Sequence, residues 1–175
     1  SALRTRTNFQ PTPMRASSKV NDDCMAEFEA LIRPGITEKE MADAIRGIYA
    51  AHGCSGVSFP PICGFGAHAA DPHHDNDDTP LEAGQCVLID VGGVYQDYCS
   101  DMTRTFFTGE PSEEERKVYE LVRQAQAAAE ALVKPGVRLC DIDAAARDLI
   151  TEAGYGPYFN PRLGHFIGLE DHEAG

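Results

Sequence analysis

The stretch from Val87 to Phe107 constrains this chain more than any other. It consists of two runs rich in β-branched and aromatic residues, which flank the polar pair Gln96-Asp97. This pattern predicts a β-hairpin with a two-residue turn at Gln96-Asp97. A turn of this length sets the pairs that face each other across the ladder: Tyr95 with Tyr98, Gly92 with Asp101, and Asp90 with Thr103.

The two faces of the predicted hairpin differ in chemistry, because alternate residues of a strand point to opposite sides. One face is apolar and is expected to belong to a core: Ile89, Val91, Tyr95, Tyr98, Met102 and Phe106. The other face carries Asp90 and Asp101 as diagonal neighbours. Two carboxylates so close repel each other unless a cation lies between them. We therefore predict a metal site there, with room for the ion left by Gly92.

Composition and charge narrow the class of protein. The 175 residues suffice for one domain with a core, and 42% hydrophobic and 25% charged residues are typical of soluble globular proteins. The net charge of −13 argues against nucleic acid and membrane partners and suits a protein that binds cations. No apolar run could span a bilayer, no signal peptide is apparent, and the six cysteines lack a Cys-x-x-Cys spacing. These features predict a cytoplasmic protein with reduced thiols.

Local signals predict four helices around the hairpin. Capping boxes begin at Thr37 and Ser112, and Pro-Gly pairs follow the expected helix ends. The segments that we expect are an arm or linker over 1–18, helices over 19–32, 37–52, 112–133 and 141–153, and glycine-spaced strand and loop over 155–175.

An internal repeat organises these elements. The break Arg33-Pro34-Gly35-Ile36 recurs as Lys134-Pro135-Gly136-Val137, and each copy lies between two predicted helices. We therefore expect one domain over 19–175, built from two similar halves over about 19–109 and 112–175. At this offset the second copy of the hairpin would fall beyond Gly175, so the second half is expected to be incomplete.

Three histidines are candidates for chemistry. His165 lies in a glycine-rich segment that would let a backbone approach a metal, and neutral imidazole is a good ligand for transition metals. His73 and His172 hold related places in the two halves, where they could hydrogen-bond a substrate carbonyl or move protons. The remaining histidines are interpreted as surface residues: His52, His68 and His74.

Three sequence strings resemble one known family. They are Ile89-Asp90-Val91-Gly92, then Tyr98-Cys99-Ser100-Asp101-Met102-Thr103-Arg104-Thr105-Phe106, and finally Gly164-His165-Phe166-Ile167-Gly168-Leu169-Glu170-Asp171-His172-Glu173. Their order and spacing resemble the pita-bread metallopeptidases, above all the Xaa-Pro aminopeptidases and the Xaa-Pro dipeptidases (prolidases). The resemblance implies an α+β pita-bread fold with two pseudo-symmetric αβ halves.

The resemblance also implies a reaction and a site. A dinuclear centre, most often manganese and sometimes cobalt, zinc or iron, would activate the water that releases the N-terminal residue from Xaa-Pro peptides. Asp90 would bind one metal, Asp101 would bridge both, and His165 would bind the other. His73 and His172 would hold the substrate and stabilise the tetrahedral intermediate. Two glutamate ligands are expected beyond Gly175, since Glu170 and Glu173 lie inside the histidine motif itself.

Some features leave alternatives open. Pro161 stands where many relatives have histidine, which leaves the substrate specificity open. We expect the 175 residues alone to be inactive and the uncovered edge of the second half to favour a homodimer. A creatinase-like hydrolase of small-molecule C–N bonds is one alternative function. A pita-bread binding module that lacks activity is another.

Overall fold

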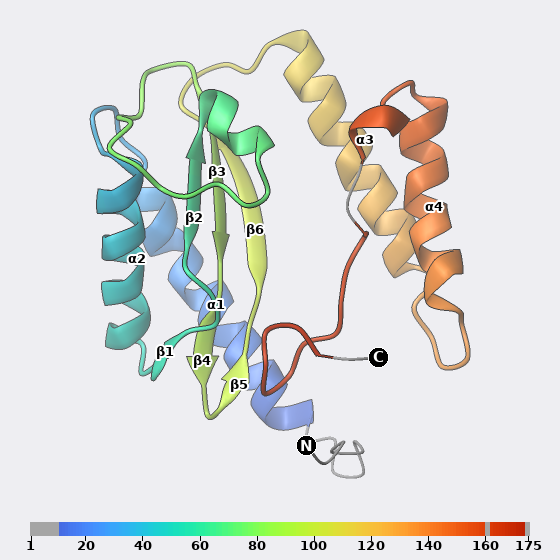
Figure 1. The fold of residues 1–175 in the computed structure, drawn as a ribbon, viewed down its shortest axis with the longest axis horizontal. Helices are drawn as coiled ribbons and strands as arrows, with labels where there is room; N and C mark the ends of the chain where they lie inside the picture. The colour runs from blue at the N-terminus through green and yellow to red at the C-terminus, as the bar shows by residue number, and fades with distance from the viewer. Residues whose placement is uncertain (1–10, 160–161, 174–175) are drawn as a thin grey trace. The chain divides into compact units, whose positions relative to one another are not determined.

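A computed structural model describes residues 11–159 and 162–173 of the chain (Figure 1). Within them lie the helices α1 (Pro11–Ala30), α2 (Glu38–Ala51), α3 (Glu113–Glu130) and α4 (Leu139–Glu152). The strands are β1 (Gly56–Val57), β2 (Ile62–Phe65), β3 (Cys86–Val91), β4 (Gly93–Tyr95), β5 (Tyr98–Cys99) and β6 (Met102–Phe107), and 3-10 turns are η1 (Gly66–Ala70) and η2 (Gly156–Tyr158). No helix among these residues is long and apolar enough to cross a bilayer. The chain divides into two compact units, Ser1–Glu110 with Phe166–Gly175, and Pro111–His165.

The predicted hairpin is present in the first unit. Gln96 and Asp97 have φ angles of 52° and 67°, as a two-residue turn of the primed type requires. Tyr95 pairs with Tyr98 and Asp90 pairs with Thr103, so the predicted register is confirmed. The hairpin contributes to two antiparallel sheets with the strand orders β1-β4-β5 and β2-β3-β6.

Gly92 marks the point where the hairpin passes from one sheet to the other. It is buried, and a Cβ atom placed on it would collide with the carbonyl oxygen of Ser100 and press on the Phe59 ring. The prediction that this glycine leaves room for an ion is therefore wrong. The space that its missing side chain would occupy is filled by the backbone of the neighbouring strand.

The core of the first unit lies between the helices α1 and α2 and one face of the sheet β2-β3-β6. Alternate residues of β3 are buried, as its period of two predicted. Helix α2 contributes residues spaced by one turn. The buried cluster consists of Cys24, Phe28, Ile36, Met41, Ala42, Ile45, Tyr49, Cys63, Phe65, Leu81, Val87, Ile89 and Val91.

Helix α1 begins earlier than the sequence analysis predicted. It starts at Pro11 rather than near residue 19, so the expected arm over 1–18 is wrong for its described part. Proline is tolerated in the first helical turn, where the backbone N–H has no partner within the helix. Ser17 is buried and donates to the carbonyl oxygen of Tyr98 at 2.9 Å, and Asn21 donates to that of Val91 at 3.5 Å. The added turns therefore bring Ser17 onto the hairpin, next to the contact that Asn21 makes.

The second unit is a helical pair with a small core. Helix α3 opens with the predicted capping box at Ser112, and its alanine face packs against α4. The buried residues are Ala125, Ala129, Ala146 and Ile150. This unit ends at His165, whereas the predicted second half extended to residue 175.

Residues 166–173 belong to the first unit. The amide of Cys99 donates to the carbonyl oxygen of Gly168 at 2.7 Å, which places this segment beside β5. The prediction of a strand within 155–175 is wrong for the described residues 155–159 and 162–173. Among them, a single bridge joins Phe166 and Glu173. Glycines weaken strands because they offer no side chain to pack.

The glycines that define the sequence repeat have matching backbone conformations. Gly35 and Gly136 have φ angles of 91° and 87°, and Gly53 and Gly154 have φ angles of 83° and 91°. Each is left-handed, the conformation that ends helices and tight turns. The repeat therefore extends from residue type to local geometry.

Gly92→Ala should test the strand crossing. The new methyl group cannot fit without moving the Ser100 backbone, so we expect the free energy of unfolding to fall by about 3 kcal/mol. Gly47→Ala is the matched control, because Gly47 lies exposed within α2 with nothing within 4 Å. Gly47→Ala should raise the free energy of unfolding by about 0.5–1 kcal/mol. Urea titration measures both, and equal effects of the two changes would contradict this role of Gly92.

Candidate metal centre

Asp90 and Asp101 both lie on the hairpin, one within β3 and the other directly before β6. Asp90 lies on β3, is partly buried, and its Oδ1 accepts the Thr103 hydroxyl at 2.7 Å. Asp101 follows β5, is exposed, and lies two residues before Thr103, the pairing partner of Asp90. Burial raises the pKa of Tyr49, and the negative charges of Asp101 and Asp90 add to this rise. Both carboxylates therefore lie within electrostatic reach of one tyrosine.

This pair suits a divalent ion. Carboxylate oxygens are the donors that manganese and magnesium prefer, and they also bind zinc. The Thr103 hydroxyl orients the Asp90 carboxylate as outer partners of metal ligands do. Asp90 and Asp101 can therefore supply two ligand residues from one rigid hairpin.

His165 is the last residue of the second unit and is exposed. The segment before it is fixed, because the amide of Leu163 donates to Asp143 Oδ1 at 3.0 Å. Asp143 is in turn held by two hydrogen bonds from Arg147, at 2.7 and 3.1 Å. Asp90 and Asp101 belong to the other unit, so a site shared with His165 stays a prediction.

His73 and His172 both belong to the first unit, and both are exposed. The amide of His73 donates to Asp71 Oδ1 at 2.9 Å, which fixes its backbone in a turn. His172 Nε2 lies 3.5 Å from Asp171 Oδ2. Their predicted contacts with substrate are not tested by these positions. Pro161, the other departure noted in the sequence, lies outside the described residues.

The structure reveals a cluster that the sequence analysis missed. Glu38 is fully buried at the start of α2, and the rings of His68 and His74 converge on its carboxylate. His68 Nδ1 lies 2.9 Å from Oε1, and His74 Nε2 lies 2.6 Å from Oε2. The amides of Phe65 and Asp77 donate to the same two oxygens at 3.0 and 3.1 Å. The hydrogen bond to Glu38 is the main cause that raises the pKa of His68.

Interpreting His68 and His74 as simple surface residues was therefore incomplete. The His74 side chain is only 11% exposed, and that of His68 is 35% exposed. Glu38 lies 30 and 36 residues before His68 and His74, and the three residues follow no helical or strand period. The one local signal is the position of Glu38, directly after the cap Thr37, where a loop can close over it.

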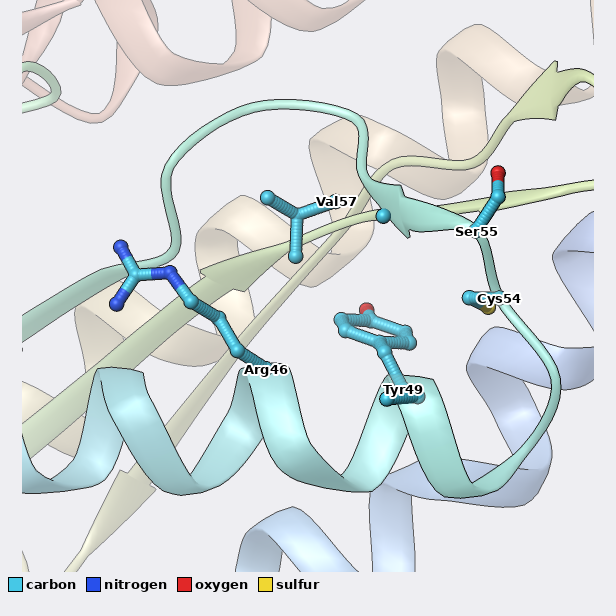
Figure 2. A pocket seen from close by; sticks show the side chains of 7 residues that line it. Arg46, Tyr49, Cys54, Ser55 and Val57 are labelled. Atoms are coloured by element: carbon cyan, nitrogen blue, oxygen red, sulfur yellow. The ribbon is translucent and has the colours of Figure 1, made fainter.

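A small hollow of about 220 Å³ lies elsewhere in the first unit (Figure 2). Arg46 and Tyr49 of α2 face the segment that carries Cys54, Ser55 and Val57. None of the predicted site residues lines it. Its apolar lining and small volume make it a packing feature rather than a substrate site.

Comparison with known proteins identifies the family. The sequence profile of metallopeptidase family M24 matches residues 12–175. The chain belongs to metallopeptidase family M24. Members of this family use divalent metal ions, and the α+β architecture is their pita-bread fold.

Relatives of this M24 chain include peptidases of several bacteria. An uncharacterized peptidase of Staphylococcus aureus is 41% identical over 160 residues, which is 91% of this chain and 46% of that protein. The X-Pro aminopeptidase from Thermotoga maritima is 37% identical with a TM-score of 0.90, over 94% of this chain and 47% of that one. The Xaa-Pro dipeptidase from Bacillus anthracis is 36% identical with a TM-score of 0.93, over 97% and 48%. The chain thus spans about half the length of these relatives.

The ion pair of Asp143 and Arg147, which holds the segment before His165, should make the stability of the second unit depend on pH. The hydrogen bonds from Arg147 lower the pKa of Asp143, so its contribution is present above its unfolded pKa and is lost as pH falls. We expect Asp143→Asn to lower the melting temperature at about pH 6 and to have a smaller effect as the pH is lowered toward about 3. Asp148→Asn, at an exposed position of the same helix, is the control. If Asp143→Asn lowers the melting temperature equally at both pH values, the Asp143 charge does not stabilise this segment.

Proposed function

We propose that the protein is a metallopeptidase that removes the N-terminal residue from short peptides with proline in second position. The observation that carries this proposal is the register of the hairpin, which pairs Asp90 with Thr103, two residues after Asp101. The likeness to an X-Pro aminopeptidase and an Xaa-Pro dipeptidase, at 37% and 36% identity, supports the substrate class.

Asp90, Asp101 and His165 are the residues that we propose to hold two divalent ions, of which manganese is the first choice. When bound, such ions would lower the pKa of a water ligand and polarise the scissile carbonyl. Asp90 would keep its orientation through the Thr103 hydroxyl. The ions would also relieve the repulsion between Asp90 and Asp101.

His73 and His172 are proposed to bind the substrate. Each side chain is exposed and can donate a hydrogen bond to the peptide carbonyl, where negative charge develops during attack by water. The amide of His73 donates to Asp71 Oδ1 at 2.9 Å, which holds the backbone that carries this side chain.

The proposal predicts hydrolysis that depends on the hairpin aspartates. The protein at its full natural length, supplied with manganese, should cleave a peptide with proline in second position faster than the same peptide with alanine there. Asp90→Asn and Asp101→Asn should each lower kcat/KM by more than about a hundredfold, since even outer partners of metal ligands contribute 10–100-fold. Release of the free N-terminal amino acid measures the rate.

Asp97→Asn is the matched control for these changes. Asp97 lies in the same hairpin but at the turn, where its φ of 67° is one that asparagine also adopts readily. The Asp97→Asn variant should be as active as the unchanged protein. Absence of cleavage with every divalent metal, or equal activity of Asp90→Asn and Asp97→Asn, would overturn the proposal.

A further inference from the structure

The cluster of Glu38, His68 and His74 has the composition of a metal site. Each residue offers one ligand atom, and these atoms all lie within 4.8 Å of one another. Two imidazole nitrogens with one carboxylate are a donor set found in zinc proteins, which leaves a fourth position for water. We propose that these three side chains bind one divalent transition-metal ion, with zinc as the best match.

The distances suit an ion after a small adjustment. Ligand atoms around tetrahedral zinc lie about 3.3 Å apart, as follows from bonds of 2.0–2.1 Å. The nitrogens of His68 and His74 lie 2.9 and 2.6 Å from the two oxygens of Glu38. The two rings lie side by side, with centroids 4.2 Å apart and planes tilted by 33°. Both rings therefore already point at one carboxylate and need to move only slightly outward.

The surroundings hold the carboxylate and attract a cation. The amides of Phe65 and Asp77 fix the two oxygens of Glu38 in place, as outer partners do in metal sites. The Glu38 side chain is fully buried, so its charge must be offset nearby. The loop that carries His74 adds four aspartates: Asp71, Asp75, Asp77 and Asp78.

This site is separate from the hairpin pair. Its ligands come from the start of α2, from η1 and from the loop after η1, whereas Asp90 lies in β3 and Asp101 lies directly before β6. An ion here would join α2 to the loop that also carries His73. The expected role is to stiffen this loop, without any part in hydrolysis.

Metal binding can be tested with the hairpin pair silenced. In the full-length protein with Asp90→Asn and Asp101→Asn, zinc titration by calorimetry should show one site, and cobalt should give the absorption bands of a tetrahedral site. Adding His68→Asn or His74→Asn should weaken zinc binding by more than about a hundredfold. Zinc should raise the melting temperature of the double variant and leave that of the triple variants unchanged.

His52→Asn in the same background is the matched control. His52 is a partly buried histidine that contacts Glu27 from the far end of α2, and zinc binding should survive its loss. The competing arrangement is a protonated histidine that alone offsets Glu38. It predicts no zinc site in the double variant, or one that is insensitive to His68 and His74, and either result would overturn the proposal. Glu38→Gln is avoided, because this buried carboxylate also anchors two backbone amides.

Discussion

The close crossing of the hairpin strands at Gly92, Gly93 and Ser100 is the contact on which the first unit depends. The amide of Ser100 donates to the carbonyl oxygen of Gly93 at 3.0 Å, and the amide of Gly93 donates to Ser100 Oγ at 3.1 Å. Ser58 adds a hydrogen bond from its amide to the carbonyl oxygen of Gly92 at 2.8 Å. Because no side chain separates the strands, the ladder passes from one sheet to the other without losing register. Asp90 and Asp101 flank this crossing, so backbone contacts set the relation between their backbone positions, while the Thr103 hydroxyl orients the Asp90 carboxylate.

Local rules were sufficient wherever a feature is decided within a few residues. The turn at Gln96-Asp97, the ladder that follows from it and the capping boxes at Thr37 and Ser112 all depend on neighbours in sequence, and all were predicted. The start of α1 was missed because prolines near residue 11 suggest an irregular arm, whereas the helix is held by its hydrogen bonds to the distant hairpin. The role of Gly92 was misjudged for a related reason, since the alternation of faces does not show how closely two backbones approach. Such errors arise where tertiary contacts decide the local conformation.

The candidate site residues also fall into those that the sequence indicated and those that it did not. The hairpin aspartates could be proposed from the sequence because the register that pairs Asp90 with Thr103 follows from a local turn. Glu38, His68 and His74 could not, because they meet only when the loop after η1 folds back over the start of α2. A glutamate in the first helical turn is normally exposed and interacts with the helix dipole. Here it is instead buried, and its oxygens accept hydrogen bonds from a strand, a loop and two histidines.

The start of α2 also explains how His73, although exposed, can be held in a defined position. Glu38 holds the amide of Phe65, at the end of β2, where the loop begins. On the returning side of the loop, the amide of Glu38 donates to the carbonyl oxygen of Thr79, and the amide of Leu81 donates to that of Ile36 at 2.8 Å. Both ends of the loop are thus tied to one helix terminus before the chain enters β3, the strand that carries Asp90. Loops that carry function depend on such rigid supports. The position of His73 relative to Asp90 therefore depends on a buried carboxylate that takes no part in the proposed hydrolysis.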